Sequence, residues 1–238
     1  MSNSLTTFAK IAQKRIESAA LANRPSGKLL FALDASGSRE STWAMSKKLT
    51  IPLFARIREL GELSISLGYF NGGTSANSFA DQCQFSTYVS DAEQLTLLMN
   101  QVSCMSCNTQ IEKILDHALL ETLKPVGEKP SAMIYIGDDM EENLTSLVTK
   151  ARVLHSRNFP IFMFLENTSY TSNTDRSAFK AIAEASGGAF AEFTEGAADV
   201  MLDWIKSAVS FAIGGLAALT REANRGSKSA QLLLTQMK

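Results

Sequence analysis

Residues 29–38 read LLFALDASGS, and this stretch decides the fold. Five apolar residues run without a break into Asp34, and hydroxyl side chains follow at Ser36 and Ser38. A buried parallel strand typically has such a continuous apolar run, and open α/β sheets hold their ligand sites at the carboxyl ends of their strands. The pattern therefore predicts a buried parallel strand with Asp34 at the ligand-binding edge of the sheet.

The Asp-x-Ser-x-Ser pattern at residues 34–38 offers oxygen ligands to a hard divalent cation. Mg²⁺ prefers oxygen atoms in an octahedral array, and one carboxylate with two hydroxyls on a tight turn supplies them without neutralising the ion. A position on the ion stays open for a further ligand. The same residue types also favour a helix cap or an Asx turn, so the prediction needs support from elsewhere in the chain.

The composition is that of a globular protein with one domain. Of the 238 residues, 45% are hydrophobic and 20% are charged, and a single sheet of about 200 residues with extra helices accounts for the length. The net charge of -1 gives no attraction to nucleic acid or to anionic membranes. The three cysteines do not form a disulfide framework, and the N-terminus lacks the apolar segment of a secretion signal.

The longest apolar stretch, residues 208–219, is interrupted by Ser210 and Gly214-Gly215 and falls short of the roughly 20 residues that span a bilayer. We therefore expect a cytoplasmic protein without a membrane span and without a nucleic-acid partner. The oligomeric state is left open by the sequence.

Predicted strands and helices alternate along the chain. Strands are expected at residues 63–70, 83–89, 132–137, 159–165 and 188–193, and helices at residues 42–60, 91–102, 109–123, 141–156 and 176–185. This alternation favours a three-layer α/β fold with a mostly parallel central sheet and helices on both faces. We divide the chain into an N-terminal amphipathic helix (1–26), the α/β domain (27–195) and a C-terminal helical extension (196–238), with both ends packing on the domain.

Two later segments add oxygen ligands at the ends of predicted elements. Thr109 begins the helix predicted at 109–123, and Gly137-Asp138-Asp139 follows the strand predicted at 132–137. Together with the 34–38 loop, their order and spacing resemble the von Willebrand factor A (VWA) domain and its metal-ion-dependent adhesion site. The resemblance covers roughly Gly27 to Phe193, and the flanks resemble an uncharacterised group of small bacterial proteins of this type.

The resemblance implies a Rossmann-like fold and a role for each residue of the site. Ser36 and Ser38 would bind the cation through their hydroxyls, and Thr109 would bind it in at least one state. Asp34 and Asp138 would act mainly through bound water and hydrogen bonds to the serines. The implied cofactor is Mg²⁺, with Mn²⁺ or Ca²⁺ as alternatives.

Two segments depart from the usual pattern of the family. Cys104-Met105-Ser106-Cys107-Asn108 stands where a glycine-containing segment usually precedes the threonine, and Gly137-Asp138-Asp139 stands where Thr-Asp-Gly is commoner. Cys104-x-x-Cys107 is compatible with a redox pair, half a zinc site or ordinary thiols, and a zinc site needs a second half. The cysteine segment puts the Thr109 contact in more doubt than the two serines.

We expect a non-enzymatic, metal-dependent protein-binding module whose partner presents an Asp or Glu side chain to the cation. Asp139, Glu141 and Glu142 are candidates for partner contacts, although acids at this place also suit the first turn of the helix predicted at 141–156. A metal-assisted hydrolase or phosphatase using the same loop is the alternative, and Ser36 lacks the Gly-x-Ser-x-Gly elbow of a serine nucleophile. A further alternative is a scaffold with the VWA fold and no working metal site.

Overall fold

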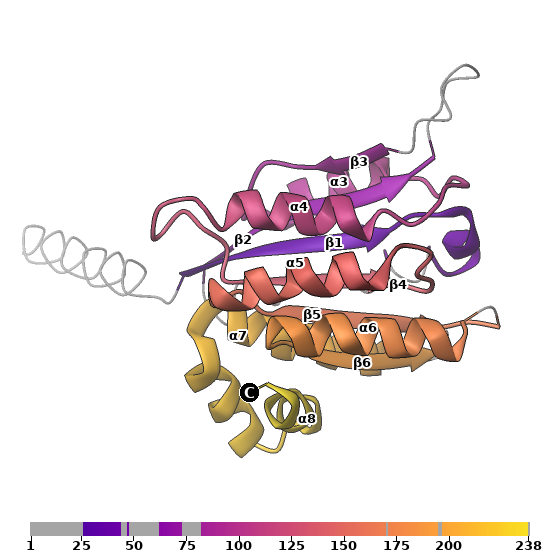
Figure 1. Cartoon of the computed structure of the whole chain (residues 1–238). Helices are drawn as coiled ribbons and strands as arrows, with labels where there is room; N and C mark the ends of the chain where they lie inside the picture. The colour runs from indigo at the N-terminus through magenta and orange to yellow at the C-terminus, as the bar shows by residue number, and fades with distance from the viewer. Residues whose placement is uncertain are drawn as a thin grey trace, which may run out of the picture.

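The computed structural model describes residues 26–43, 47, 62–72, 82–169, 171–194 and 197–237. The helix expected within residues 1–26 and most of the helix expected at 42–60 lie outside these residues. The described part forms a six-stranded sheet in the order β3-β2-β1-β4-β5-β6, covered on both faces by helices (Figure 1).

The strands and helices have the following bounds. The strands are β1 (Ser26–Asp34), β2 (Glu62–Asn71), β3 (Gln82–Phe85), β4 (Ala132–Gly137), β5 (Ile161–Asn167) and β6 (Ala189–Thr194). A 3-10 turn, η1 (Gly37–Arg39), follows β1, and the α-helices are α3 (Ala92–Gln101), α4 (Ile111–Glu121), α5 (Leu144–Ser156), α6 (Asn173–Ser186), α7 (Ala198–Asn224) and α8 (Lys228–Gln236).

The sheet is parallel except at one edge. β1 pairs in parallel with both β2 and β4, and β4, β5 and β6 continue the parallel order, whereas β3 runs antiparallel to β2. The apolar run Leu29–Leu33 is fully buried, as a central strand covered on both faces requires. The prediction of a three-layer α/β fold with a mostly parallel sheet is confirmed.

Successive residues of β1 point into two different cores, because side chains alternate along a strand. Leu29, Phe31 and Leu33 belong to the core shared with α3 and α7, whereas Leu30 and Ala32 belong to the core shared with α4, α5 and α6. Figure 1 shows the same division, with α4, α5 and α6 on the near face and α3 and α7 behind the sheet.

The strand order reverses between β1 and β4, because the chain passes from β1 to β2 on one side and later returns to β4 on the other. At such a reversal the connections leave the two strand ends in opposite directions, which opens a crevice where α/β proteins bind ligands. Asp34 ends β1 at this point, and Asp138 follows β4. The topology therefore brings two separated acids to the ligand-binding edge.

Most predicted boundaries differ from the structure by about one to four residues. The strand expected at 83–89 ends at Phe85, although Val89 still forms a single bridge with Ile65. The helices expected to begin at residues 109 and 141 begin at Ile111 and Leu144 instead. The physical reason is that residues 138–142 form an irregular loop in which Glu141 and Glu142 bond to Thr109 and Ile111, and Asn143 then caps α5 by accepting a hydrogen bond from the Ser146 N–H.

Helix α7 is long and apolar enough, by length and composition, to cross a membrane, and it is the one such helix in the described part of the chain. The core helix of a soluble protein passes the same test. Here Met201, Ile205 and Ala208 are buried in the core against the sheet, and the helix is kinked at Gly214 and Gly215. The expectation that the chain has no membrane span therefore stays a prediction.

Substitution of Ile205 by alanine tests whether α7 is a core helix in solution. Ile205 is fully buried, so Ile205→Ala should lower the free energy of unfolding by about 2–5 kcal/mol in urea titrations of the purified protein. Leu216 lies on the same helix and is 55% exposed, so Leu216→Ala should change it by less than about 0.5 kcal/mol. Equal effects of the two substitutions would contradict the packing of α7 on the sheet.

Candidate metal centre

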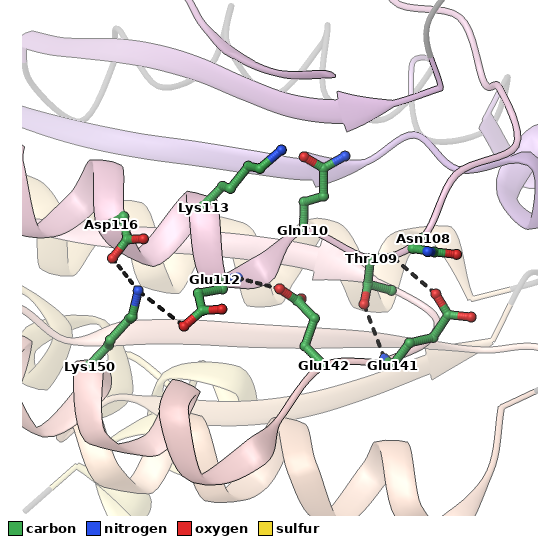
Figure 2. A pocket seen from close by; sticks show the side chains of 9 residues that line it. All are labelled: Asn108, Thr109, Gln110, Glu112, Lys113, Asp116, Glu141, Glu142 and Lys150. Carbon is green, nitrogen blue, oxygen red and sulfur yellow. Dashed lines mark hydrogen bonds and ion pairs between the residues drawn. The ribbon is translucent and has the colours of Figure 1, made fainter. Parts of the chain in front are cut away.

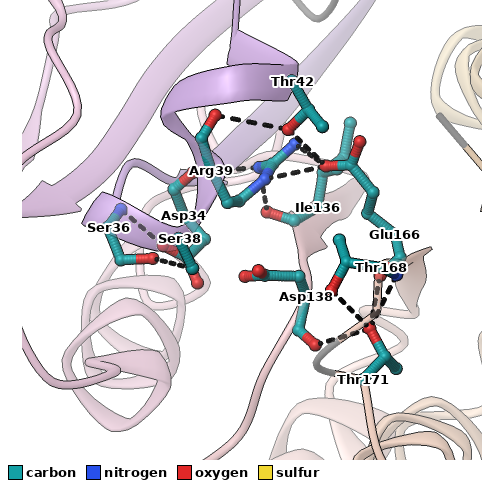
Figure 3. A network of polar contacts seen from close by, with 10 residues as sticks. All are labelled: Asp34, Ser36, Ser38, Arg39, Thr42, Ile136, Asp138, Glu166, Thr168 and Thr171. Atoms are coloured by element: carbon teal, nitrogen blue, oxygen red, sulfur yellow. Dashed lines mark hydrogen bonds and ion pairs between the residues drawn. The ribbon is translucent and has the colours of Figure 1, made fainter.

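The loop after β1 gathers the first three predicted ligands. Asp34 is fully buried, and its Oδ1 accepts a hydrogen bond of 2.7 Å from the Ser36 N–H. This bond forms an Asx-type turn, which directs the following residues back over the strand end. The hydroxyl oxygens of Ser36 and Ser38 then lie 3.0 Å apart (Figure 3).

The loop at residues 104–107 packs against this turn. The Met105 N–H donates to the Ala35 carbonyl at 3.0 Å, and a Cβ on Gly72 would lie 2.3 Å from the Ser106 carbonyl oxygen. The backbone of residues 104–107 therefore supports the loop formed by residues 34–38. Cys104 and Cys107 form no disulfide with each other, and burial raises the pKa of Cys104 to about 11, which makes it a poor nucleophile at neutral pH.

Asp138 completes the group from the neighbouring strand. β1 and β4 are in register at Leu33 and Ile136, so the two strands end side by side. Asp138 is 2% exposed; burial raises its pKa, while the charge of Arg39 and hydrogen bonding with Ser38 act in the opposite direction. Four of the five predicted metal-site residues, Asp34, Ser36, Ser38 and Asp138, thus lie together (Figure 3).

Each of the two aspartates has one buried oxygen without a hydrogen-bond partner among the described residues, namely Asp34 Oδ2 and Asp138 Oδ1. Burial of a carboxylate oxygen without a partner is costly. Burial raises the pKa of Asp34 to about 6, and the charge of Asp138 acts in the same direction. A cation between the carboxylates would remove both penalties, so the residues present fit a divalent metal ion.

Arg39, which the sequence analysis did not single out, lies directly under the loop and is fully buried. Its Nη1 donates to the carbonyl oxygens of Asp34 (2.9 Å) and Ile136 (3.3 Å), and its Nε and Nη2 donate to Glu166 Oε2 at 3.0 and 2.8 Å. Thr42 donates a further hydrogen bond to the same Glu166 oxygen. One guanidinium therefore joins the carboxyl ends of β1, β4 and β5 (Figure 3).

The charges of this group favour a divalent cation. Burial works to lower the pKa of Arg39, but the carboxylates of Glu166, Asp34 and Asp138 outweigh it and raise the pKa, so the guanidinium stays charged. The formal charges of three carboxylates and one guanidinium sum to minus two in this buried region. One divalent ion neutralises this charge.

The fifth predicted ligand, Thr109, is engaged elsewhere. Its hydroxyl oxygen accepts a hydrogen bond from the Glu141 N–H, and its own N–H donates to Glu141 Oε2, both at 3.1 Å (Figure 2). Thr109 therefore precedes α4 as part of a reciprocal pair with Glu141. Its expected contact with the metal stays a prediction.

The three acids proposed for partner contacts make hydrogen bonds within the chain. Glu142 accepts from the Ile111 N–H at 2.6 Å and from the Glu112 N–H at 2.9 Å, so it caps the N-terminus of α4 rather than the first turn of α5. A carboxylate is favourable there because the first N–H groups of a helix lack partners. Asp139 accepts a hydrogen bond from the Met140 N–H. A role of Asp139, Glu141 and Glu142 in partner binding stays a prediction.

A polar cavity of about 630 Å³ lies beside this cap, between α4 and α5 (Figure 2). Its lining residues are Asn108, Thr109, Gln110, Glu112, Lys113, Asp116, Glu141, Glu142 and Lys150. Glu112 and Asp116 both pair with Lys150, and the four acids of the lining outnumber its two lysines. Among the described residues, no cluster of three or more His, Cys, Asp or Glu side chains suits a metal ion. The candidate centre has two carboxylates, Asp34 and Asp138, so hydroxyl oxygens would have to complete its ligand set.

No protein-family model matches the sequence, and no curated protein is significantly similar to it. Solved structures are similar in fold. The pilus adhesin SpaC from Lactobacillus rhamnosus GG, in its open conformation, matches with a TM-score of 0.62 at 11% identity, over 80% of this chain and 31% of the adhesin. The SpRpn10 VWA domain matches with a TM-score of 0.57 at 13% identity, over 74% of this chain and 94% of that domain.

A third similar structure is proximal thread matrix protein 1 from the mussel byssus with a zinc-occupied MIDAS motif. It matches with a TM-score of 0.60 at 17% identity, over 78% of this chain and 46% of the mussel protein. The chain thus spans less than half of the mussel protein and less than a third of the adhesin, but nearly all of the SpRpn10 domain. The sheet order, the two helical layers and these similarities show that the chain has the von Willebrand factor A fold.

Proposed function

We propose that the chain is a metal-dependent protein-binding module. In this proposal Asp34, Ser36, Ser38 and Asp138 hold a divalent cation, and an Asp or Glu side chain of a partner protein completes its coordination. The observation that carries the proposal is the pair of buried carboxylates that each leave one oxygen without a partner, beside two adjacent hydroxyls. Neutral hydroxyl ligands leave a cation electrophilic, so it can still attract a carboxylate from outside.

Mg²⁺ is the metal we propose, with Mn²⁺ or Ca²⁺ as alternatives, because all the candidate ligands are oxygen atoms. Thr109 would join the site on release of its two hydrogen bonds with Glu141. Asp139, Glu141 and Glu142 would then lie next to the bound partner. We further propose a non-enzymatic role in the cytoplasm, which is consistent with three cysteines that form no disulfide with one another.

Removal of both serine hydroxyls tests the metal site. Ser36→Ala combined with Ser38→Ala should reduce Mg²⁺ affinity at least tenfold in isothermal titration calorimetry, because two of the candidate ligands disappear while the fold keeps its packing. The matched control is Ser156→Ala combined with Ser177→Ala, since these helix hydroxyls donate only to backbone carbonyls. Unchanged Mg²⁺ binding by the Ser36/Ser38 variant would show that the site is not where we place it.

Mg²⁺ affinity should also depend on pH. Burial, opposed by Arg39 and Ser36 and reinforced by Asp138, raises the pKa of Asp34 to about 6. A proton on this carboxyl competes with the cation, so the affinity should be constant above pH 7 and fall by about tenfold per pH unit below pH 6. Calorimetric titrations between pH 5 and 8 measure this, with circular dichroism to verify folding. A flat profile would contradict a role for Asp34.

Partner binding should require the metal. A protein captured from a bacterial lysate in the presence of Mg²⁺ should be released by EDTA, and the Ser36/Ser38 variant should fail to capture it. Substitution of the Asp or Glu that the partner presents should abolish binding without altering Mg²⁺ affinity of the chain. Retention of the partner in EDTA contradicts the proposal, as does metal-dependent turnover of phosphoester substrates above background.

A further inference from the structure

The buried positive charge of Arg39 lies beside the proposed cation site. A fully buried guanidinium donates to the Asp34 carbonyl directly beneath the loop. Burial raises the pKa values of Asp34 and Asp138, and the charge of Arg39 opposes this rise at both carboxylates. A fixed positive charge in this position repels any cation. The repulsion is strong because water, which would screen it, is excluded from the surroundings of a buried charge.

Glu166 offsets this repulsion. It is 3% exposed, and one of its oxygens accepts two hydrogen bonds from the guanidinium and a third from Thr42. Its charge also reaches the proposed metal site: burial is the main cause of the raised pKa of Asp138, and the charge of Glu166 adds to it. Glu166 is therefore both the structural partner of Arg39 and a source of negative charge at the site.

The arginine also restricts where the ligands lie. Its bonds to the Asp34 and Ile136 carbonyls fix the last peptide of β1 against the end of β4. Trp43 lies against the guanidinium, 5.8 Å from its carbon to the ring centroid, and anchors itself to the Val102 carbonyl. The side chain is enclosed, so the positive charge cannot move away from the site when a cation arrives.

We propose that Glu166 is an affinity-determining residue for the metal: it neutralises Arg39, so that Asp34 and Asp138 keep two uncompensated negative charges for one divalent cation without Glu166 itself binding the ion. This inference rests on the proposed metal site. It assigns Arg39 to positioning of the ligands and Glu166 to the charge balance.

Glu166→Gln separates charge from shape, because the amide oxygen still accepts hydrogen bonds from Arg39 while the charge is lost. The variant should bind Ca²⁺ at least tenfold more weakly in calorimetry. It should lose still more affinity for Tb³⁺, an ion of similar radius and higher charge, because electrostatic repulsion scales with the charge of the ion. A displaced loop would weaken both ions by the same factor.

The matched control is Glu121→Gln, a buried acid that pairs with Lys124 at the opposite end of α4. It should leave both affinities within twofold of the unsubstituted protein. A second variant covers the case in which an unpaired Arg39 unfolds the chain. Arg39→Met combined with Glu166→Gln removes both charges and so restores the two net negative charges of Asp34 and Asp138. This double variant should bind Ca²⁺ more tightly than Glu166→Gln alone. If Glu166→Gln is unfolded, the double variant should bind Ca²⁺ within tenfold of the unsubstituted protein.

The inference is overturned if Glu166→Gln is folded and binds both ions as the unsubstituted protein does, or loses the same factor for each. It is also overturned if the folded double variant binds Ca²⁺ no better than folded Glu166→Gln, or more than tenfold more weakly than the unsubstituted protein. In these cases the proposed metal site stands, because the unsubstituted protein still binds metal. Absence of metal binding by the unsubstituted protein overturns the proposed function and this inference together.

Discussion

The guanidinium of Arg39 is the point at which the functional edge of this sheet is held together. Parallel strands end side by side but have no hydrogen bonds of their own beyond their last residues, so something must fix their ends. Here the bonds of one side chain reach Asp34 on β1, Ile136 on β4 and Glu166 on β5. These three strands are neighbours in the sheet and span the reversal of strand order. The candidate ligands thus stand on a rigid base.

A buried ion pair contributes little to net stability, because the loss of hydration of both charges offsets their attraction. Its presence is better understood through specificity: the fork of donors on arginine satisfies several acceptors in one fixed geometry. An apolar side chain at position 39 would leave the Asp34 and Ile136 carbonyls without these donors. The pair therefore sets the position of the loop, and Glu166 keeps the loop attractive to a cation.

The sequence predicted the sheet and most of the site because both depend on local patterns. Apolar runs mark β1, β4 and β5, and an acid ends or follows each of them at Asp34, Asp138 and Glu166. Glu166 was not predicted as a site residue, although it directly follows the apolar run of β5 as Asp34 follows the apolar run of β1. This shared position was the signal that could have identified it. Arg39 gave a weaker signal, because an arginine after a polar loop is usually exposed.

The arrangement around Thr109 was less predictable for a physical reason. Glu141 and Glu142 were expected to favour the helix that follows them, since acids suit a first turn. In the structure they reach 30 or more residues back along the sequence, to Thr109 and to the first N–H groups of α4. Local spacing does not encode which of two nearby helix N-termini an acid will cap. Only the packing of α4 beside α5 decides it.

The hydrogen bonds made by these acids leave one position at this edge of the sheet that favours a cation. Several acids lie at this edge of the sheet, and in the described residues most of them already have donors: Glu166 from Arg39 and Thr42, Asp139 from Met140, Glu141 from Thr109, and Glu142 from Ile111 and Glu112. Among the acids at this edge, Asp34 and Asp138 each keep one buried carboxylate oxygen without a donor in the described part of the chain. Backbone N–H groups and one arginine donate to the surrounding acids. The unbalanced negative charge is therefore concentrated beside Ser36 and Ser38. Their hydroxyl oxygens would complete a ligand set for a metal ion.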